Sequence, residues 1–186
     1  MASEAAAAEE APGRGAQKDG QWAHRLAAPE QGCVLLAHPA LFSASQNYFS
    51  RAVIFLFEHS DKGSAGVILN RPTDKKMDLL LRGVGSLAMF GDQPLYMGGD
   101  VGEAAVTVVH GYPQLAGSRE IVPGVAMGGV EAAAAAVGAG AASASDFRFF
   151  SKYCGWGPGC APPCRAVPAA TSCSSCGLCL MLLFAF

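Results

Sequence analysis

The stretch from Arg51 to Thr73 constrains the fold more than any other part of the chain. Val53–Phe57 is a run of five apolar residues, mostly β-branched or aromatic, which is short for a helix and typical of a buried strand. A polar segment that ends at Gly63 follows, and Gly66–Leu69 resumes a β-prone run. Pro72 restricts the residue before it to extended conformations, which disfavours a helical continuation. The stretch therefore predicts two buried strands joined by a polar turn.

Polar side chains gather at the ends of these two predicted strands. Glu58 and His59 follow the first strand, and Asn70 and Arg71 follow the second. If they face one another, His59 is a candidate base oriented by Glu58 or Asp61, and Asn70 or Arg71 is a candidate for stabilising an anion. This pattern defines an alternative in which the protein is a hydrolase or transferase. Structural capping and ion pairing explain the same residues equally well.

The rest of the chain predicts further strands and two helices. Gly98–Gly99 permits positive φ angles or a close backbone approach, whereas Gly128–Gly129 lacks the spacing of a phosphate-binding loop. One predicted helix starts at Thr73 or Asp74, ends near Gly83 and carries Met77, Leu80 and Leu81 on one face. The other predicted elements are strands at 32–37, 94–97, 105–110 and 121–127 and a helix at 130–137.

Composition limits the classes of partner. The net charge is −2, and the lysines and arginines are scattered, so we expect no direct binding to nucleic acid or to an anionic membrane surface. Residues 1–20 are rich in Ala and Glu and contain no large apolar side chain after Met1, so we expect a disordered tail. Its glutamates argue against a secretory signal or a transit peptide.

Several phrases of the sequence resemble the AlgH-like family of bacteria and plants. They include Gly32–Ala37, Gly63–Pro72 with its Leu-Asn-Arg-Pro ending, and Met97–Gly99. The resemblance covers roughly residues 22–158. The segments Ala144–Phe150 and Tyr153–Gly159 are similar to the plant members.

The resemblance implies a single domain over 21–159 of the α/β class (α+β type), with a bulged, coiled, mixed β-sheet flanked by helices. It supplies no established catalytic residue and no cofactor, because the activity of the family is unassigned. The bacterial family name refers to transcriptional regulation. We therefore expect a non-catalytic regulatory or interaction protein that acts indirectly, through a protein partner, in the cytoplasm or a plastid.

Residues 160–186 depart from the family pattern. Six of the seven cysteines lie from Cys154 onward, and the sequence becomes rich in Ala, Ser and Cys. Such an abrupt change is typical of a shifted reading frame, a retained intron or an alternative splice. We expect this tail to be the least ordered part of the chain after the N-terminus. Its last apolar residues, 178–186, are too few to span a bilayer, which takes about 20.

The alternative for the tail is a metal-binding module. Cys173, Cys176 and Cys179 have the spacing of part of an iron–sulfur site, and Cys160 or Cys164 is a candidate fourth ligand. The Cys-Pro pair that completes a bacterial ferredoxin motif is missing, and no histidine follows for a mixed zinc site.

Overall fold

The structure is a computed structural model that describes residues 24–26, 28–37, 48–80, 85–158 and 180–185. Strands dominate the described residues, and α1 (Val130–Gly138) is their one α-helix. Short 3-10 helices are η3 (Met77–Leu79), η4 (Gly85–Phe90) and η5 (Ala144–Asp146). The strands are β1 (His24–Arg25), β2 (Val34–Ala37), β3 (Val53–Ser60), β4 (Gly63–Ile68), β5 (Pro72–Lys76), β6 (Pro94–Met97), β7 (Val101–His110), β8 (Ser118–Val122), β9 (Val125–Gly128), β10 (Arg148–Trp156) and β11 (Leu180–Ala185).

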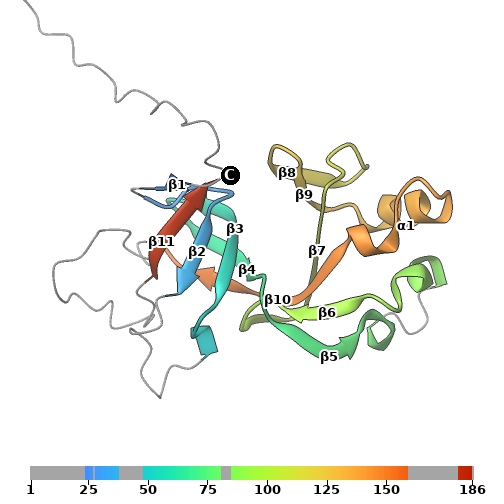
Figure 1. The fold of residues 1–186 in the computed structure, drawn as a ribbon, viewed down its shortest axis with the longest axis horizontal. Helices are drawn as coiled ribbons and strands as arrows, with labels where there is room; N and C mark the ends of the chain where they lie inside the picture. The colour runs from blue at the N-terminus through green and yellow to red at the C-terminus, as the bar shows by residue number, and fades with distance from the viewer. Residues whose placement is uncertain (1–23, 27, 38–47, 81–84, 159–179, 186) are drawn as a thin grey trace, which may run out of the picture.

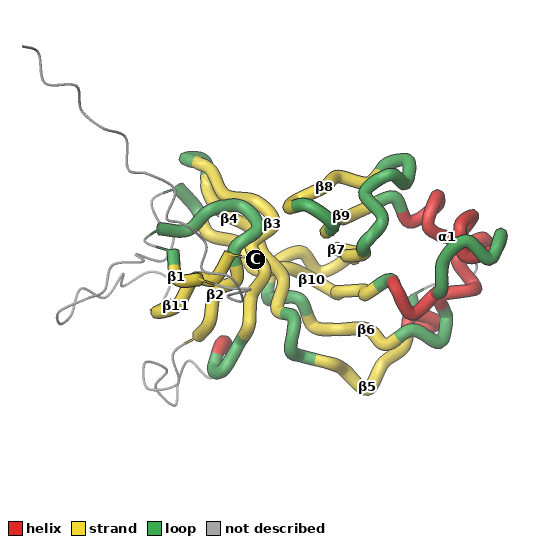
Figure 2. The backbone as a smooth tube through the Cα atoms, turned by 45° about the horizontal axis from the view of Figure 1, so that its top comes forward, coloured by secondary structure: helices red, strands yellow, loops and turns green. Residues whose placement is uncertain are grey.

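One hydrogen-bonded network connects all of these strands. Its main path runs β1-β11-β2-β3-β4-β10-β7-β9-β8, and β6 joins β10 while β5 joins β6. The pairing of β6 with β10 is parallel and the other pairings are antiparallel. Figure 1 shows β1–β4 and β11 on one side and β5–β9 with α1 on the other, with β10 running between them. The tube in Figure 2 shows the same division from a second direction, so β10 joins the two halves.

The predicted hairpin from Arg51 to Thr73 is confirmed. Ile54 pairs with Ile68 and Ser60 pairs with Gly63, so β3 and β4 form an antiparallel pair around the turn at Asp61 and Lys62. A register shift between Leu56 and Glu58 marks a bulge in β3. Similar shifts occur in β10 and β11, which confirms the prediction of a bulged, mixed sheet.

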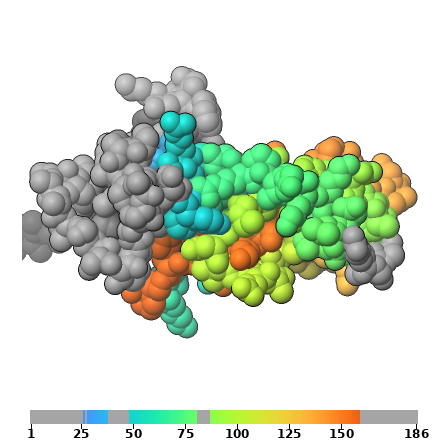
Figure 3. All heavy atoms as spheres, turned by 90° about the horizontal axis from the view of Figure 1, so that it is seen from below, coloured from blue at the N-terminus to red at the C-terminus, as the bar shows by residue number. Residues whose placement is uncertain are grey.

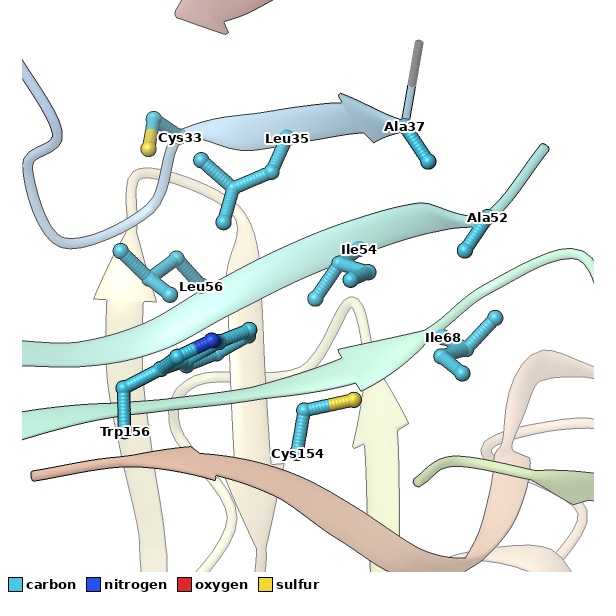
Figure 4. Close-up of a cluster of buried hydrophobic side chains, with 9 residues drawn as sticks. All are labelled: Cys33, Leu35, Ala37, Ala52, Ile54, Leu56, Ile68, Cys154 and Trp156. Carbon is cyan, nitrogen blue, oxygen red and sulfur yellow. The ribbon is translucent and has the colours of Figure 1, made fainter. Parts of the chain in front are cut away.

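Three apolar clusters form the core of the described residues, and the third joins Val34, Phe55, Val67, Ile121 and Phe150. In the first, β2, β3, β4 and β10 contribute Leu35, Ile54, Ile68 and Trp156 to a common interior, as Figure 4 shows. In the second, aromatic side chains pack beneath α1, with the Phe90 and Phe149 rings 5.1 Å apart. The helix contributes only small buried residues, Ala133 and Ala134, which allow it to lie close to η4.

The helix predicted to begin at Thr73 or Asp74 is wrong. Pro72–Lys76 forms β5, which pairs with β6, and the Thr73 hydroxyl donates to the Leu95 carbonyl at 2.6 Å. A single 3-10 turn, η3, replaces the remainder of the helix within the described residues. The predicted strand at 121–127 is two strands, because Pro123 and Gly124 turn the chain between β8 and β9.

The predicted α/β class with flanking helices holds only in a coarser form, because the described residues are dominated by the sheet and α1 is their one α-helix. The predicted helix at 130–137 is confirmed as α1, and the predicted strand at 94–97 is confirmed as β6. No helix of the described residues is long and apolar enough to cross a membrane.

The C-terminal tail contributes a strand that the sequence did not predict. Leu180–Ala185 forms β11 and lies antiparallel between β1 and β2, with Leu183 opposite Leu35. For these six residues the expectation of an unordered tail does not hold. Residues 1–20 and 160–179, which include every cysteine of the proposed metal module, lie outside the described residues.

Candidate functional site

The family-like phrases of the sequence meet at a junction that we call the Arg71 centre, made of Tyr48, Arg71, Gly98, Gly99 and Cys154. Arg71 lies between the end of β4 and the start of β5, and its carbonyl accepts from Met97 N at 2.9 Å. The Gly98 carbonyl accepts from Ile68 N at 2.8 Å, and Gly98 N donates to the Ser151 carbonyl at 2.7 Å. The glycine pair therefore ties β4 and β6 to the centre of β10.

Close backbone approach explains why both positions are glycine. A Cβ atom on Gly99 would lie 1.9 Å from the Tyr153 carbonyl carbon, and one on Gly98 would lie 2.5 Å from the Lys152 oxygen. Real Cβ atoms do not come this close to backbone atoms. The prediction that Gly98–Gly99 permits a close approach is confirmed, and the approach is to β10 of the same chain.

The side chains of the centre surround this glycine pair. The Tyr48 hydroxyl donates to the Gly99 carbonyl at 2.5 Å, and the Cys154 thiol donates to the Gly98 carbonyl at 3.3 Å. The Arg71 guanidinium lies 4.7 Å from the centroid of the Tyr48 ring, a cation–π contact. Sequence reasoning had singled out Arg71 but had missed Tyr48 and Cys154, which reach the centre only through the tertiary fold.

The electrostatics of the centre oppose nucleophilic chemistry. The pKa of Cys154 is raised to about 12, mainly by burial and to a smaller extent by the Asp100 carboxylate, while the Arg71 guanidinium acts in the opposite direction. Burial also raises the pKa of Tyr48, which keeps its hydroxyl a hydrogen-bond donor. Because thiolates rather than thiols are nucleophilic, Cys154 is inert at neutral pH. The hydrogen bonds of the Arg71 centre link β4, β6 and β10. Arg71 is the one positively charged residue among its five members.

The predicted cluster of Glu58, His59, Asn70 and Arg71 does not form. His59 lies opposite Ser64 near the hairpin turn, whereas Asn70 and Arg71 follow Ile68, which lies opposite Ile54 at the other end of the hairpin. Ile54 and His59 are five positions apart on β3, which is roughly 17 Å at the rise of a strand. Antiparallel pairing places the two groups at opposite ends, so the proposed base and the proposed anion-stabilising groups cannot share a substrate.

Asn70 has a structural role. Its Oδ1 accepts from Val53 N at 2.9 Å and its Nδ2 donates to the Arg51 carbonyl at 2.9 Å. The side-chain amide therefore makes two hydrogen bonds to the backbone beyond the last paired residues of β3 and β4. Arg51 has a φ of 57°, a left-handed conformation that few residues other than glycine adopt. Asn70 fixes this turn.

His59 and Ser64 form a serine–histidine pair at the other end of the hairpin. His59 Nδ1 lies 2.7 Å from Ser64 Oγ, and Ser64 is buried. Ser64 and the exposed Glu58 line a cavity of about 370 Å³ together with Tyr153 and Trp156. Within the described part of the chain no carboxylate hydrogen-bonds to the His59 ring, so the group that orients the base in a catalytic triad is missing there.

His110 is buried, unlike the half-buried His59, and sequence reasoning had not singled it out as a candidate. Its Nδ1 accepts from Tyr112 N at 3.2 Å, which assigns the proton to Nε2. Nε2 then donates to the Gly128 carbonyl at 3.0 Å, with Ser118 Oγ 3.3 Å away. The ring therefore joins β7 to β9 and has no unpartnered nitrogen.

The described residues contain no group of three or more side chains that could hold a metal ion. Cys33 and Cys154 are buried and unpaired, and burial raises the pKa of both thiols. The predicted ligands Cys173, Cys176 and Cys179, with Cys160 and Cys164, lie outside the described residues.

The fold and the site define a sheet-dominated protein. Polar side chains of its family-like segments, such as Asn70, hydrogen-bond to backbone groups of the same chain. The profile of the AlgH-like family matches residues 34–160, and the chain belongs to this family. This confirms the resemblance found in the sequence.

Bacterial relatives agree with this assignment. A UPF0301 protein of Chlorobaculum tepidum is 35% identical over 130 residues, which are 69% of this chain and 66% of the relative. A UPF0301 protein of Chlorobium luteolum is 36% identical over 137 residues, or 73% of this chain and 67% of the relative. The match thus spans about two thirds of these relatives. Because these relatives are bacterial, the similarity to plant members stays a prediction.

Two solved structures share the fold. The crystal structure of a Corynebacterium diphtheriae protein superposes with a TM-score of 0.58 at 23% identity, covering 74% of this chain and 71% of the other. The solution structure of the AlgH protein from Pseudomonas aeruginosa gives a TM-score of 0.55 at 24% identity, covering 74% of each chain.

Proposed function

We propose that this protein is a non-catalytic interaction protein with a regulatory role. It works in the cytoplasm or a plastid and acts on transcription indirectly, by binding a protein partner rather than DNA. The family assignment leaves the biochemical activity open, so the proposal depends on the surface and on the use of the polar residues.

One observation carries the proposal: an apolar patch formed by Leu79, Leu80 and Val106. Each of these side chains is between 44% and 45% exposed, and contiguous exposed apolar residues mark interaction sites. Leu80 and Val106 line the same apolar cavity, so these two side chains belong to one surface, and Leu79 directly precedes Leu80 in the chain. In Figure 3 the green atoms of the β5 segment, which leads into η3, form part of the molecular surface.

The polar residues favour binding over catalysis. Asn70 is committed to the backbone of Val53 and Arg51, and the Cys154 thiol stays protonated at neutral pH. For the hydrolase or transferase alternative, the described residues offer His59 hydrogen-bonded to Ser64, a serine that the sequence-based hypothesis had not included. A net charge of −2 without a basic cluster gives no electrostatic basis for binding DNA.

Site-specific photo-cross-linking tests the proposal. A photoreactive amino acid at position 79, within the patch, should cross-link one recurrent protein in a cell extract. The same group at exposed Lys62, at the hairpin turn, is the matched control and should give no such product. Excess unlabelled wild-type protein should compete, and the Leu80→Glu variant should not. Equal products from both positions, or a saturable shift of DNA at physiological salt, would contradict the proposal.

A fluorophosphonate probe tests the enzymatic alternative in the same preparations. Such probes label activated serines covalently, and we expect no labelling at Ser64. Labelling that disappears in both Ser64→Ala and His59→Ala would establish a serine nucleophile and favour the alternative.

A further inference from the structure

The apolar cavity that Leu80 and Val106 line has a volume of about 420 Å³ and lies between β7, β9, β10 and the start of α1. Its walls are mainly apolar and include Leu87, Val108, Met127, Val130 and Phe149. The volume falls within the range of about 300–1,000 Å³ that is typical of small-molecule sites. Side chains from seven elements converge on this space, namely η3, η4, β7, β8, β9, α1 and β10.

The cavity suits an apolar body of limited size. Apolar cavities of about 150 Å³ accept benzene, so this space has room for about ten to fifteen non-hydrogen atoms. Water in it would find few polar partners, because Thr107 and Arg119 contribute the polar side chains of the lining. Phe149 is fixed by its contact with Phe90, which keeps the inner wall in place.

Arg119 supplies a positive charge at the edge of the cavity. It lies on β8 opposite Met127 of β9, and both side chains line the cavity. In the described part of the chain, the Arg119 guanidinium makes one hydrogen bond. Its Nη2 donates to the Phe57 carbonyl at 3.3 Å. Among the described residues, no carboxylate oxygen lies within 4.0 Å of an Arg119 nitrogen. A guanidinium has five N–H donors, so Arg119 can bind a carboxylate without giving up its contact with β3.

We propose that this cavity binds a small amphipathic carboxylate, with its apolar body between β7, β9 and α1 and its charged group at Arg119. The ligand class is a medium-chain or aromatic monocarboxylic acid. The inference does not rest on the proposed partner, but the two sites adjoin, because Leu80 and Val106 belong to the patch and also line the cavity.

Calorimetric titration of the purified full-length chain with decanoate tests the proposal, and decanol is the uncharged probe of similar shape. Saturable binding of one decanoate per chain is expected, with weaker binding of decanol. Arg119→Gln should weaken decanoate binding about tenfold, the typical value of a hydrogen bond to a charged group, and leave decanol unchanged. Arg148→Gln is the matched control, because this exposed arginine stacks on Tyr96 and does not line the cavity.

A cavity-filling variant, Val130→Phe, should abolish binding of both probes while circular dichroism stays that of the wild type. If Val130→Phe does not fold, the comparison of Arg119→Gln with Arg148→Gln still decides the result. Three outcomes would overturn the proposal: no saturable binding to the wild type, equal loss in both arginine variants, or decanol bound as tightly as decanoate.

Discussion

At the scale of single residues, Asn70 shows how a polar group in a family-like phrase can serve the backbone. Removing its amide in Asn70→Ala leaves Val53 N and the Arg51 carbonyl to water. The site is exposed, so we expect a loss of about 1–2 kcal/mol in the free energy of unfolding, measured by urea denaturation. Asn70→Asp keeps the acceptor but loses the donor, and its effect should be intermediate.

The control for Asn70 is Lys75→Ala, an exposed change in β5 that should stay within about 0.5 kcal/mol of the wild type. A stable Asn70→Ala variant would show that the two hydrogen bonds contribute nothing to folding and would reopen a chemical role for the side chain.

Cys154 makes a second residue-scale prediction, which concerns alkaline pH. Its pKa rises from 9.0 to about 12 on folding, so the folded chain keeps the thiol proton longer than the unfolded chain. The corresponding stability is fully present below about pH 9 and is lost as pH rises toward 12. Each group with this behaviour contributes up to about 1.4 kcal/mol per pH unit in that window.

Urea denaturation of Cys154→Ser between pH 7 and pH 10 measures this effect. Serine keeps a donor for the Gly98 carbonyl and does not titrate in this range, so the alkaline loss of stability should become shallower. It should not vanish, because the pKa values of Cys33 and Tyr48 are also raised. Identical pH dependence in wild type and variant would contradict the assignment of a protonated, buried thiol.

At the scale of elements, β11 determines whether the divergent tail belongs to the fold. It covers the backbone edge of β2, which would otherwise present unpaired N–H and C=O groups to other molecules. A chain that ends at residue 179 should therefore melt several degrees lower and aggregate more readily, as followed by calorimetry and light scattering. Deletion of residues 2–20 is the matched control and should leave the melting temperature unchanged. An unchanged melting temperature in the shortened chain would instead support the sequence-based expectation of a dispensable tail.

The sequence predicts those strands and helices whose residues carry a clear local pattern. The β3–β4 hairpin follows from two local apolar runs and Pro72, and α1 follows from an Ala-rich segment after a glycine pair. In contrast, the residues of β5 read locally as a helix start, and their pairing with β6 about twenty residues later decided the outcome. Local pattern cannot predict a pairing that is settled by a distant strand.

The candidate site was harder to predict for the same reason. Glu58 and Asn70 are close in sequence, yet antiparallel pairing separates them, whereas Tyr48, Gly99 and Cys154 converge from distant segments. Arg119 gave no sequence signal, because an isolated arginine in a polar stretch reads as a surface residue.

At the scale of the whole molecule, the proposed binding surface and the serine–histidine pair lie at different places. The apolar patch lies on η3 and β7, in the half of the sheet that carries α1, and the His59–Ser64 pair lies at the turn of the β3–β4 hairpin in the other half. Substitutions in the patch therefore leave the His59–Ser64 pair intact, and the reverse also holds. A binding function predicts that patch substitutions reduce activity, whereas a catalytic function predicts this for substitutions of His59 and Ser64.

The most direct measurement is the dissociation constant of the cross-linked partner, determined by calorimetry for the wild type, Leu80→Glu and the double variant His59→Ala, Ser64→Ala. We expect Leu80→Glu to weaken binding at least tenfold, because it places a charge in the centre of an apolar contact. We also expect the double variant to bind as the wild type does. Unchanged binding by Leu80→Glu, together with lost binding by the double variant, would contradict the account and place the function at the serine–histidine pair.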